Sequence, residues 1–292
     1  MTNVFPMGIE VTTAARTARD LKLVSDLFHQ INRVLPEAQK LLTLPPDMPA
    51  REAVAMLHAR SFSQAPVMEG RTVLGVFSFR SFARRAAKFQ YAEMARQKLA
   101  PGDFSVEECI EQFEYARVTS EMKNVFDAME RDNGVLVGGP ERLQGILTPM
   151  DVLRYLYKVA SPFVMVSEIE LTLRALIRVV LSPEEIIACA IRSLAQHYGS
   201  EDKVPKTLEA MTFDNYRLIV GRDETWPKFS PLLGLNKNRV KAKLQQICEL
   251  RNDLFHFKRE ISIEDHEILS EHRNWLLLTA QKAEIRAAGG VA

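Results

Sequence analysis

Residues 73–82, VLGVFSFRSF, decide the fold of the N-terminal half, because residues 143–152, LQGILTPMDV, repeat their pattern. The two central glycines, Gly75 and Gly145, are 70 residues apart. Each copy reads as a short apolar strand that ends at a hydroxyl residue, with a polar residue three positions later at the start of a helix. The chain therefore contains an internal repeat.

The segments around these stretches repeat as well. Residues 50–60 and 120–131 have the spacing of amphipathic helices, and residues 65–68 and 134–137 read as a second strand in each copy. Residues 69–71 and 138–140, which carry glycines, predict the hairpin turns. Each repeat is thus predicted to run helix, strand, turn, strand, helix.

Residues before and between the repeats predict further helix. Residues 1–37 are expected to form a lead-in with one helix, 14–34, packed on the repeats. Residues 84–117, between the two copies, look helical with a break at Pro101-Gly102.

The pattern changes after residue 160 to long helices without strands. Helices are predicted at 167–181, 183–198, 237–256 and 261–288. Ser182 followed by Pro183 is typical of a helix start, and Ser161-Pro162 is expected to join the two halves. The fold class is therefore α+β: a lead-in at 1–37, a repeated module at 38–160, and an all-α domain at 161–292.

Composition limits the classes of function. A formal net charge of +1 on 292 residues argues against a protein that coats nucleic acid by charge alone. A local basic face, formed by Lys237, Arg239, Lys241 and Lys243, is possible on one helix, although solvated helix faces usually carry such runs.

Cysteine usage and hydropathy favour a cytoplasmic protein. Cys109, Cys189 and Cys248 lie far apart and are expected to be buried thiols. Neither an export signal nor a membrane span is recognised in the sequence. No metal site is expected, because His266 and His272 are six residues apart and point to different helix faces.

The repeat over residues 38–160 resembles the paired CBS domains that form Bateman modules. The resemblance implies that an adenine nucleotide (ATP, ADP or AMP) binds as a regulatory ligand between the repeats. A carboxylate at a helix start can accept hydrogen bonds from ribose hydroxyls, and the helix N-terminus favours phosphate. Thr148 and Asp151 match this pattern, whereas Ser81 replaces the carboxylate three residues after Ser78.

The expected nucleotide-binding residues follow from this resemblance. They are Thr148, Asp151, Gly145, Val118, Thr119, Val135, Val137, Ser78, Ala65 and Val67. One strong site is expected on the second repeat, with a weak or empty one on the first. The alternative for Thr148 and Asp151 is a plain helix cap.

A polar motif lies late in the helical domain, at residues 249–257, ELRNDLFHF. On a helix, Asn252 and His256 share a face, and the long side chain of Arg251 reaches the same edge. Histidine transfers protons near neutral pH, and arginine offsets the charge that develops on a phosphate. This combination suits phosphodiester chemistry.

The Arg-x4-His spacing resembles the HEPN superfamily of helical nucleases, and residues 168–177 and 208–220 resemble the family's first helix and variable middle. The resemblance implies metal-independent RNA cleavage at a dimer interface, with Arg251, Asn252 and His256 as catalytic residues. A structural pair with Asp253 as salt-bridge partner is the alternative. The toxin variant that is silenced by nucleotidylation needs a tyrosine where Lys258 stands.

Together these patterns predict a nucleotide-gated endoribonuclease, a hydrolase that binds RNA and acts as a homodimer or as a tetramer of two dimers. By analogy it would serve in stress response, as a toxin, or in antiviral defence against phage. The rival prediction is a non-catalytic adenine-nucleotide sensor whose helical domain dimerises and recruits a partner protein.

Overall fold

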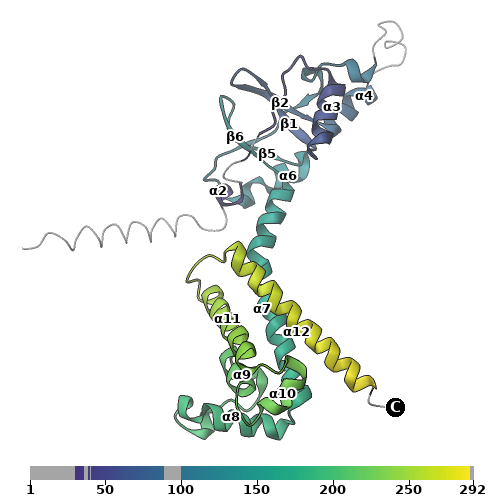
Figure 1. The fold of residues 1–292 in the computed structure, drawn as a ribbon. Coiled ribbons are helices and arrows are strands. Elements are labelled where there is room, and N and C mark those ends of the chain that lie inside the picture. Colours follow the sequence, from purple (N-terminus) through teal and green to yellow (C-terminus); the bar gives the residue numbers. More distant parts are fainter. Residues whose placement is uncertain (1–29, 36–38, 40, 89–99, 290–292) are drawn as a thin grey trace, which may run out of the picture. The chain divides into compact units, whose positions relative to one another are not determined.

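The computed structural model describes residues 30–35, 39, 41–88 and 100–289. It divides into two compact units, Met1–Leu156 and Tyr157–Ala292. The described part of the first unit mixes strands and helices, and that of the second consists mostly of helices (Figure 1). This confirms the α+β class and the mostly helical C-terminal region.

The first repeat contains helix α3 (Ala50–Ala59), strands β1 (Gln64–Glu69) and β2 (Thr72–Ser78), and helix α4 (Phe79–Lys88). The strands pair antiparallel around a tight turn in which Gly70 has a φ of +60°. Alternating apolar residues of the strands meet the inner face of α3 in a buried core that includes Leu57, Val67 and Phe77. The order of elements predicted for this repeat is confirmed.

The second repeat follows the same order. A 3-10 turn (Met122–Val125) leads into α6 (Phe126–Asp132), and β5 (Val135–Gly139) and β6 (Arg142–Leu147) form the hairpin. Helix α7 (Pro149–Val180) begins directly after β6. The two hairpins share a small apolar cluster, to which Val76 and Leu136 contribute, so the repeats pack face to face through their strands.

The segment between the repeats completes both sheets. Strand β3 (Ile110–Glu111) pairs antiparallel with β2, and β4 (Tyr115–Ala116) pairs parallel with β5. The prediction of helix is therefore wrong for residues 100–117, where the structure has these strands and short 3-10 turns. Free backbone groups at the edges of β2 and β5 stabilise an extended conformation there, and they override local propensity.

The repeat glycines lie where another segment approaches closely. A Cβ on Gly75 would meet the carbonyl oxygen of Glu111 at 2.9 Å, and a Cβ on Gly145 would meet Oε1 of Gln39 at 2.7 Å. Gln39 bonds the backbone of Ile146 on both its N–H and its carbonyl. Close packing thus accounts for glycine at both positions.

The lead-in is described only from residue 30, so most of the predicted helix 14–34 lies outside the described residues. Its last part is α2 (Ile31–Val34). The N–H groups of Ile31 and Asn32 donate to the carbonyls of Ser120 and Val118 at 3.0 and 2.9 Å. Ile31 is fully buried in the core of the second repeat.

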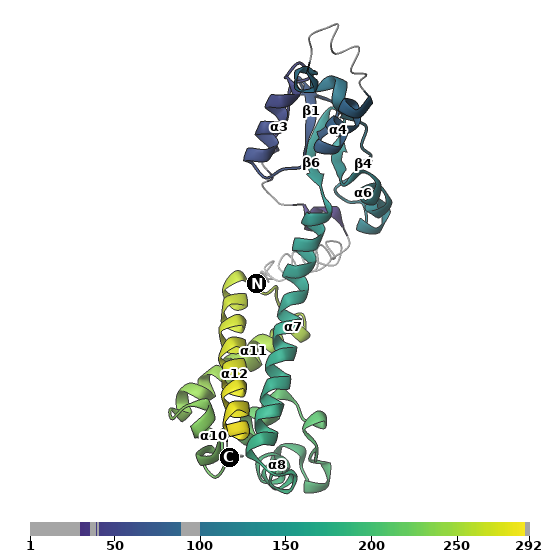
Figure 2. The same ribbon diagram turned by 90° about the vertical axis from the view of Figure 1, so that its right-hand side faces the viewer.

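The second unit contains most of α7 and the helices α8 (Pro183–Tyr198), α9 (Phe213–Val220), α10 (Trp226–Leu233), α11 (Lys237–Phe255) and α12 (Ile263–Gly289). They surround one apolar core in which Leu173, Tyr216 and Phe229 are buried. The predicted helices 183–198 and 237–256 are confirmed, and Ser182 caps α8 as expected. Within this unit α7 and α12 run side by side (Figures 1 and 2).

Helix α7 does not break at Ser161-Pro162, where the sequence predicts a junction; it continues from residue 149 to 180 with Pro162 inside (Figure 2). A proline lacks the N–H that would bond the carbonyl four residues earlier. That carbonyl, of Lys158, lies 3.3 Å from Nε2 of His266, and Nδ1 of His266 lies 3.4 Å from Oγ of Ser161. Contacts with α12 therefore replace the missing helical bond.

Two expectations from composition can be compared with the described residues. The cysteines Cys109, Cys189 and Cys248 are all buried and free. Within the described ranges, the chain has no helix that is both long and apolar enough to span a membrane.

Candidate functional site

Thr148 and Asp151 form a reciprocal cap at the start of α7. Oδ2 of Asp151 accepts from the backbone N–H of Thr148 at 3.0 Å and from its hydroxyl at 2.6 Å. The N–H of Asp151 in turn lies 3.3 Å from Oγ1 of Thr148. The cap arrangement is thus present, and it fixes the carboxylate at the C-terminal end of β6.

The second oxygen of this carboxylate, Oδ1, makes neither of these cap bonds. The guanidinium of Arg154 lies 3.9 Å from it. The Asp151 side chain is 13% exposed, while that of Arg154 is 75% exposed and can move toward an anion. Capping therefore uses one carboxylate oxygen and leaves the other for hydroxyl donors, beside a cation and a helix N-terminus. These groups fit the ribose and phosphate of a nucleotide.

The equivalent residues of the first repeat are Ser78 and Ser81, so a serine hydroxyl replaces the carboxylate of Asp151. Ser81 accepts from the N–H of Ser78 at 2.8 Å, and its own hydroxyl donates to the Ser78 carbonyl at 2.9 Å. Ser81 is 3% exposed. Its hydroxyl therefore caps α4 as Asp151 caps α7, but it offers no charged acceptor to a ligand.

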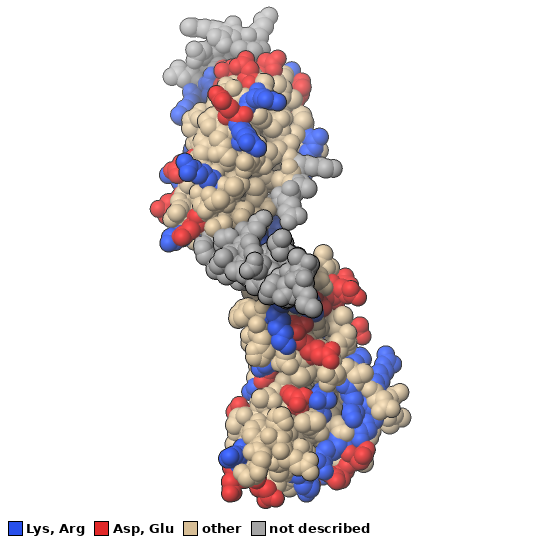
Figure 3. Space-filling view, turned by 90° about the vertical axis from the view of Figure 1, so that its left-hand side faces the viewer, with Lys and Arg blue, Asp and Glu red and all other residues tan. Residues whose placement is uncertain are grey.

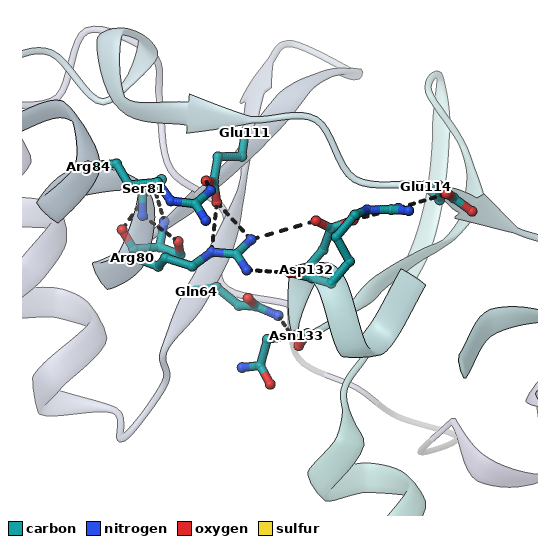
Figure 4. A network of polar contacts seen from close by, with 10 residues as sticks. Gln64, Arg80, Ser81, Arg84, Glu111, Glu114, Asp132 and Asn133 are labelled. Carbon is teal, nitrogen blue, oxygen red and sulfur yellow. Dashed lines mark hydrogen bonds and ion pairs between the residues drawn. The ribbon is translucent and has the colours of Figure 1, made fainter. Parts of the chain in front are cut away.

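An ion-pair network joins the two repeats next to Ser81 (Figure 4). Arg80, at the start of α4, donates to Oε2 of Glu111 from Nε at 3.3 Å and from Nη2 at 3.1 Å. It also donates to the carbonyl of Arg131 at 2.5 Å and lies 3.7 Å from Asp132. Arg84 binds the other oxygen of Glu111 at 2.6 Å. The charged side chains next to Ser81 are thus paired with one another within the chain.

A cavity of about 410 Å³ lies in the second repeat. Its lining includes Tyr115, Ala116, Arg117 and Val135. Val135 is the strand partner of Leu147, which directly precedes Thr148. Because β4 pairs parallel with β5, the start of β4 lies at the same end of the sheet as the start of β5. The cavity and the Thr148–Asp151 cap therefore lie at one end of the second sheet, where β4 and β5 begin and β6 finishes.

The remaining residues of the expected nucleotide set are mostly structural. Ala65, Val67, Val135 and Val137 are buried strand residues, and Ser78 is buried under its cap bonds. Gly145 is packed against the lead-in, as described above. Val118 is half-buried with its carbonyl bonded to Asn32, whereas Thr119 is exposed. The structure brings Thr148 and Asp151 together; the first-repeat members Ala65 and Val67 belong to a separate core.

The polar motif occupies the last turn of α11. Nη1 of Arg251 donates to Oδ1 of Asn252 at 3.3 Å, and the Arg251 guanidinium stacks over the Phe255 ring at 4.8 Å. Nε of Arg251 is buried without a hydrogen-bond partner among the described residues. His256 is exposed at the C-cap, and its N–H donates to the Asn252 carbonyl at 3.1 Å. Asn252 therefore contacts both other members of the motif.

Asp253 does not pair with Arg251. It binds Arg259 at 2.9 Å and lies 3.8 Å from Lys258. Arg259 also binds Asp265 at 2.5 Å, which holds the end of α11 to the start of α12 and keeps the pKa of Asp265 well below its usual range. The salt bridge that the structural alternative requires is thus made by other cations.

A basic cavity of about 360 Å³ lies at the opposite end of α11. Lys237 and Lys241, which belong to the basic run noted in the sequence, line it together with Arg222. Lys237 is paired with Asp223, and Arg222 with Glu224 at 2.8 Å. Figure 3 shows Lys and Arg side chains gathered on one face of the helical unit with acidic side chains beside them. Neighbouring acids thus offset much of this charge.

Arg80 with its network and Arg154 are not among the residues predicted from the sequence. A signal existed for the arginines, because Arg84 and Arg154 are 70 residues apart and therefore equivalent in the two repeats. Glu111 could not be found in this way, since it lies in the segment between the repeats.

Comparison with known families identifies the first repeat. Residues 37–88 match the model of the CBS domain family. No curated protein matches the chain.

Several solved structures are similar to part of the chain. One is a CBS-domain containing protein from Agrobacterium tumefaciens, with 24% identity over 44% of this chain and 98% of that one, and a TM-score of 0.36. Another is a conserved protein from Pyrococcus horikoshii, with 22% identity over 44% and 92%, and a TM-score of 0.36. A third, CBSX2 in complex with AMP, has 17% identity over 44% and 95%, and a TM-score of 0.37.

Proposed function

We propose that the protein is an adenine-nucleotide-regulated, metal-independent endoribonuclease. Its first unit, which contains a CBS domain at residues 37–88, would bind the nucleotide. Its second unit would cut RNA at the Arg251–His256 motif. Cleavage of this kind is the chemistry of the HEPN superfamily, which the motif resembles. Two sets of polar residues support the proposal: Thr148 with Asp151, and Arg251 with Asn252 and His256.

The nucleotide would bind to the second repeat. Oδ1 of Asp151 accepts the ribose hydroxyls, and Arg154 with the N-terminus of α7 faces the phosphates. CBS domains are often nucleotide sensors, and the similar structure CBSX2 was determined with AMP. ATP, ADP and AMP share the ribose that Asp151 would hold, so they differ only in how many phosphates reach Arg154.

The RNA would be cleaved by its own 2′-hydroxyl. His256 takes the proton of that hydroxyl as the oxygen bonds to the neighbouring phosphorus. The bond from phosphorus to the 5′-oxygen breaks, and the leaving 5′-oxygen takes up a proton from water. Arg251 offsets the negative charge that grows on the phosphate oxygens. Asn252 orients Arg251 through the 3.3 Å contact to Nη1. The products carry a 2′,3′-cyclic phosphate and a 5′-hydroxyl.

The observation that carries this proposal is the unpaired charge of Arg251. Within the described part of the chain, no carboxylate forms an ion pair with it; Asp253, two residues further along α11, points to another side of the helix and pairs with Arg259. A half-buried guanidinium costs free energy unless an anion compensates it. A phosphate of the substrate would supply that anion beside the exposed His256.

Dimer formation would connect the two units. The families that both units resemble work as dimers, so nucleotide binding in the first unit would alter the alignment of two motifs in the second. A homodimer, or a tetramer of two dimers, is therefore the proposed active form. Whether the nucleotide activates or inhibits RNA cleavage follows from the change in cleavage rate on its addition.

The test is cleavage of a labelled structured RNA in EDTA by the wild type and by His256→Ala, with and without ATP, ADP and AMP. Cleavage that the variant lacks is the expected result, and the nucleotide that changes its rate is the regulatory ligand. If the wild type cuts no RNA under any condition, the nuclease proposal fails. Nucleotide binding without cleavage would favour the recruiting sensor.

A further inference from the structure

Phe257 occupies a backbone position that favours glycine. It follows the C-cap of α11 with a φ of +51°, and the Lys258 N–H donates to the Asp253 carbonyl at 3.0 Å. The Phe257 N–H donates to the Leu254 carbonyl at 3.3 Å. This pair of bonds is the Schellman ending of a helix, in which the left-handed residue is usually glycine because a Cβ is strained there.

Burial does not explain the phenylalanine. Phe257 is 74% exposed, so most of its ring faces solvent. Its neighbour Phe255 is 43% exposed, packs edge-on to Phe163 at 5.5 Å, and supports the Arg251 guanidinium. The two rings flank His256 in the sequence. Phe255 packs against the fold, whereas the strained turn at Phe257 holds its ring toward solvent. Strained, exposed residues of this kind occur at functional sites.

The neighbourhood of the ring favours an anionic, aromatic partner. His256 directly precedes Phe257 and Lys258 directly follows it. Arg251 lies six residues earlier, about 1.7 helical turns, and has no carboxylate partner among the described residues. An exposed aromatic ring next to a cation is the arrangement that binds single-stranded nucleic acid, where bases stack on rings and phosphates meet the charge. An apolar protein partner would not require the unpaired guanidinium.

We propose that Phe257 is a positioning residue that stacks on an unpaired nucleobase next to the phosphate held by Arg251. The inference rests on the proposed function and gives it a substrate class, single-stranded RNA or an RNA loop. Bases inside an A-form helix are stacked on each other, so their faces are closed to a side chain. Duplex RNA therefore cannot use this contact.

The test is binding by the full chain to a fluorescent 2′-O-methyl oligonucleotide, which cannot be cleaved, as a single strand and as a duplex. Phe257→Leu keeps an apolar side chain but loses stacking, and it is expected to weaken single-strand binding by about tenfold. Phe257→Trp is expected to retain it. Leu235→Ala is the matched control, because Leu235 is 88% exposed at the other end of α11.

A fourth variant separates stacking from structure. Phe257→Gly removes the strain of the left-handed position, so it is expected to raise the melting temperature while it weakens single-strand binding as Phe257→Leu does. A lower melting temperature would mean that the ring supports the fold, and would overturn the inference. So would equal losses on single strand and duplex, or a changed oligomeric state with unchanged RNA affinity.

Cleavage is measured separately from binding, so the stacking inference and the nuclease proposal can fail independently. If the wild type cuts RNA and Phe257→Leu cuts it with the same KM, stacking fails and the nuclease stands. If the wild type binds single strands through Phe257 but never cuts, stacking stands and the nuclease fails. A wild type that binds no RNA at all overturns the stacking inference directly.

Discussion

Gln64 and Gly134 are equivalent positions of the two repeats, 70 residues apart, and they pack against each other. A Cβ on Gly134 would lie 2.5 Å from Nε2 of Gln64. That nitrogen donates to the carbonyl of Asn133 at 3.0 Å (Figure 4). The two repeats therefore fit together because one carries a large side chain where the other carries none.

Gly134→Ala is expected to lower the free energy of unfolding by about 1–3 kcal/mol, because the new methyl group displaces the Gln64 amide from its bond to Asn133. Urea unfolding of both variants measures the difference. Gly139→Ala is the control, since nothing lies within 4 Å of a Cβ there. Equal stability of the two variants would contradict the packing argument.

Asp151→Ser gives the second repeat the serine that the first repeat has at Ser81. The variant is expected to lose the stabilisation by ATP, ADP or AMP, which is about 2.7 kcal/mol at a ligand concentration 100 times the Kd. The reciprocal change, Ser81→Asp, is expected to add a second binding event in calorimetry. Thr148→Ser keeps the hydroxyl of the cap and should bind as the wild type does. Undiminished binding by Asp151→Ser would exclude the carboxylate as the ribose acceptor.

Arg251→Ala is expected to lower the RNA cleavage rate by a factor of about 10²–10³, the usual effect of removing one charge-stabilising donor. Arg251→Lys should recover part of this loss, because it retains the charge but not the planar contact with Phe255. Arg239→Ala, on the exposed first turns of the same helix, serves as the comparison. A similar loss in both alanine variants would indicate general electrostatic attraction of RNA.

His272 is expected to make the stability depend on pH. It is 4% exposed, and its Nε2 lies 2.9 Å from Oε1 of Gln246. Burial and the nearby Lys243 lower the pKa of its imidazole, against a smaller opposite effect of Glu271. The unfolded chain, with an ordinary pKa of about 6.5, therefore binds the proton first as the pH falls.

The stability that His272 contributes is thus complete above about pH 7 and declines below the unfolded pKa, by at most about 1.4 kcal/mol per pH unit. The decline ends once the pH has passed the lowered pKa of the folded protein. His272→Gln keeps a donor for Gln246 but does not titrate, so its unfolding free energy should change less between pH 7.5 and 5.5, as urea titrations would show. An identical slope in both proteins would remove His272 as the cause.

The local part of each site could be predicted from the sequence. Thr148 and Asp151 are three residues apart, so the cap between them requires only that a helix begins there. The same holds for Arg251, Asn252 and His256, whose spacing places them on the last turn of one helix. The repeat also located the hairpins, since strands and tight turns have strong local patterns.

The rest depended on contacts between distant residues. Arg80 meets Glu111 and Asp132, which are 31 and 52 positions further along the chain, so no local pattern could pair them. Residues 110–111 and 115–116 are strands because sheet edges are available to them. Pro162 lies inside a helix because His266 reaches the carbonyl that the proline leaves free.

The sequence by itself determined the two repeats, the helical C-terminal half, the capped carboxylate at Asp151 and the Arg251–His256 spacing. All of these rest on residues a few positions apart, where backbone geometry alone sets the distance. Only the tertiary structure decided that Arg80 pairs with Glu111 and Asp132, and that most of the Phe257 ring faces solvent. Such choices among partners are made by packing, which brings together groups that the chain itself does not keep close.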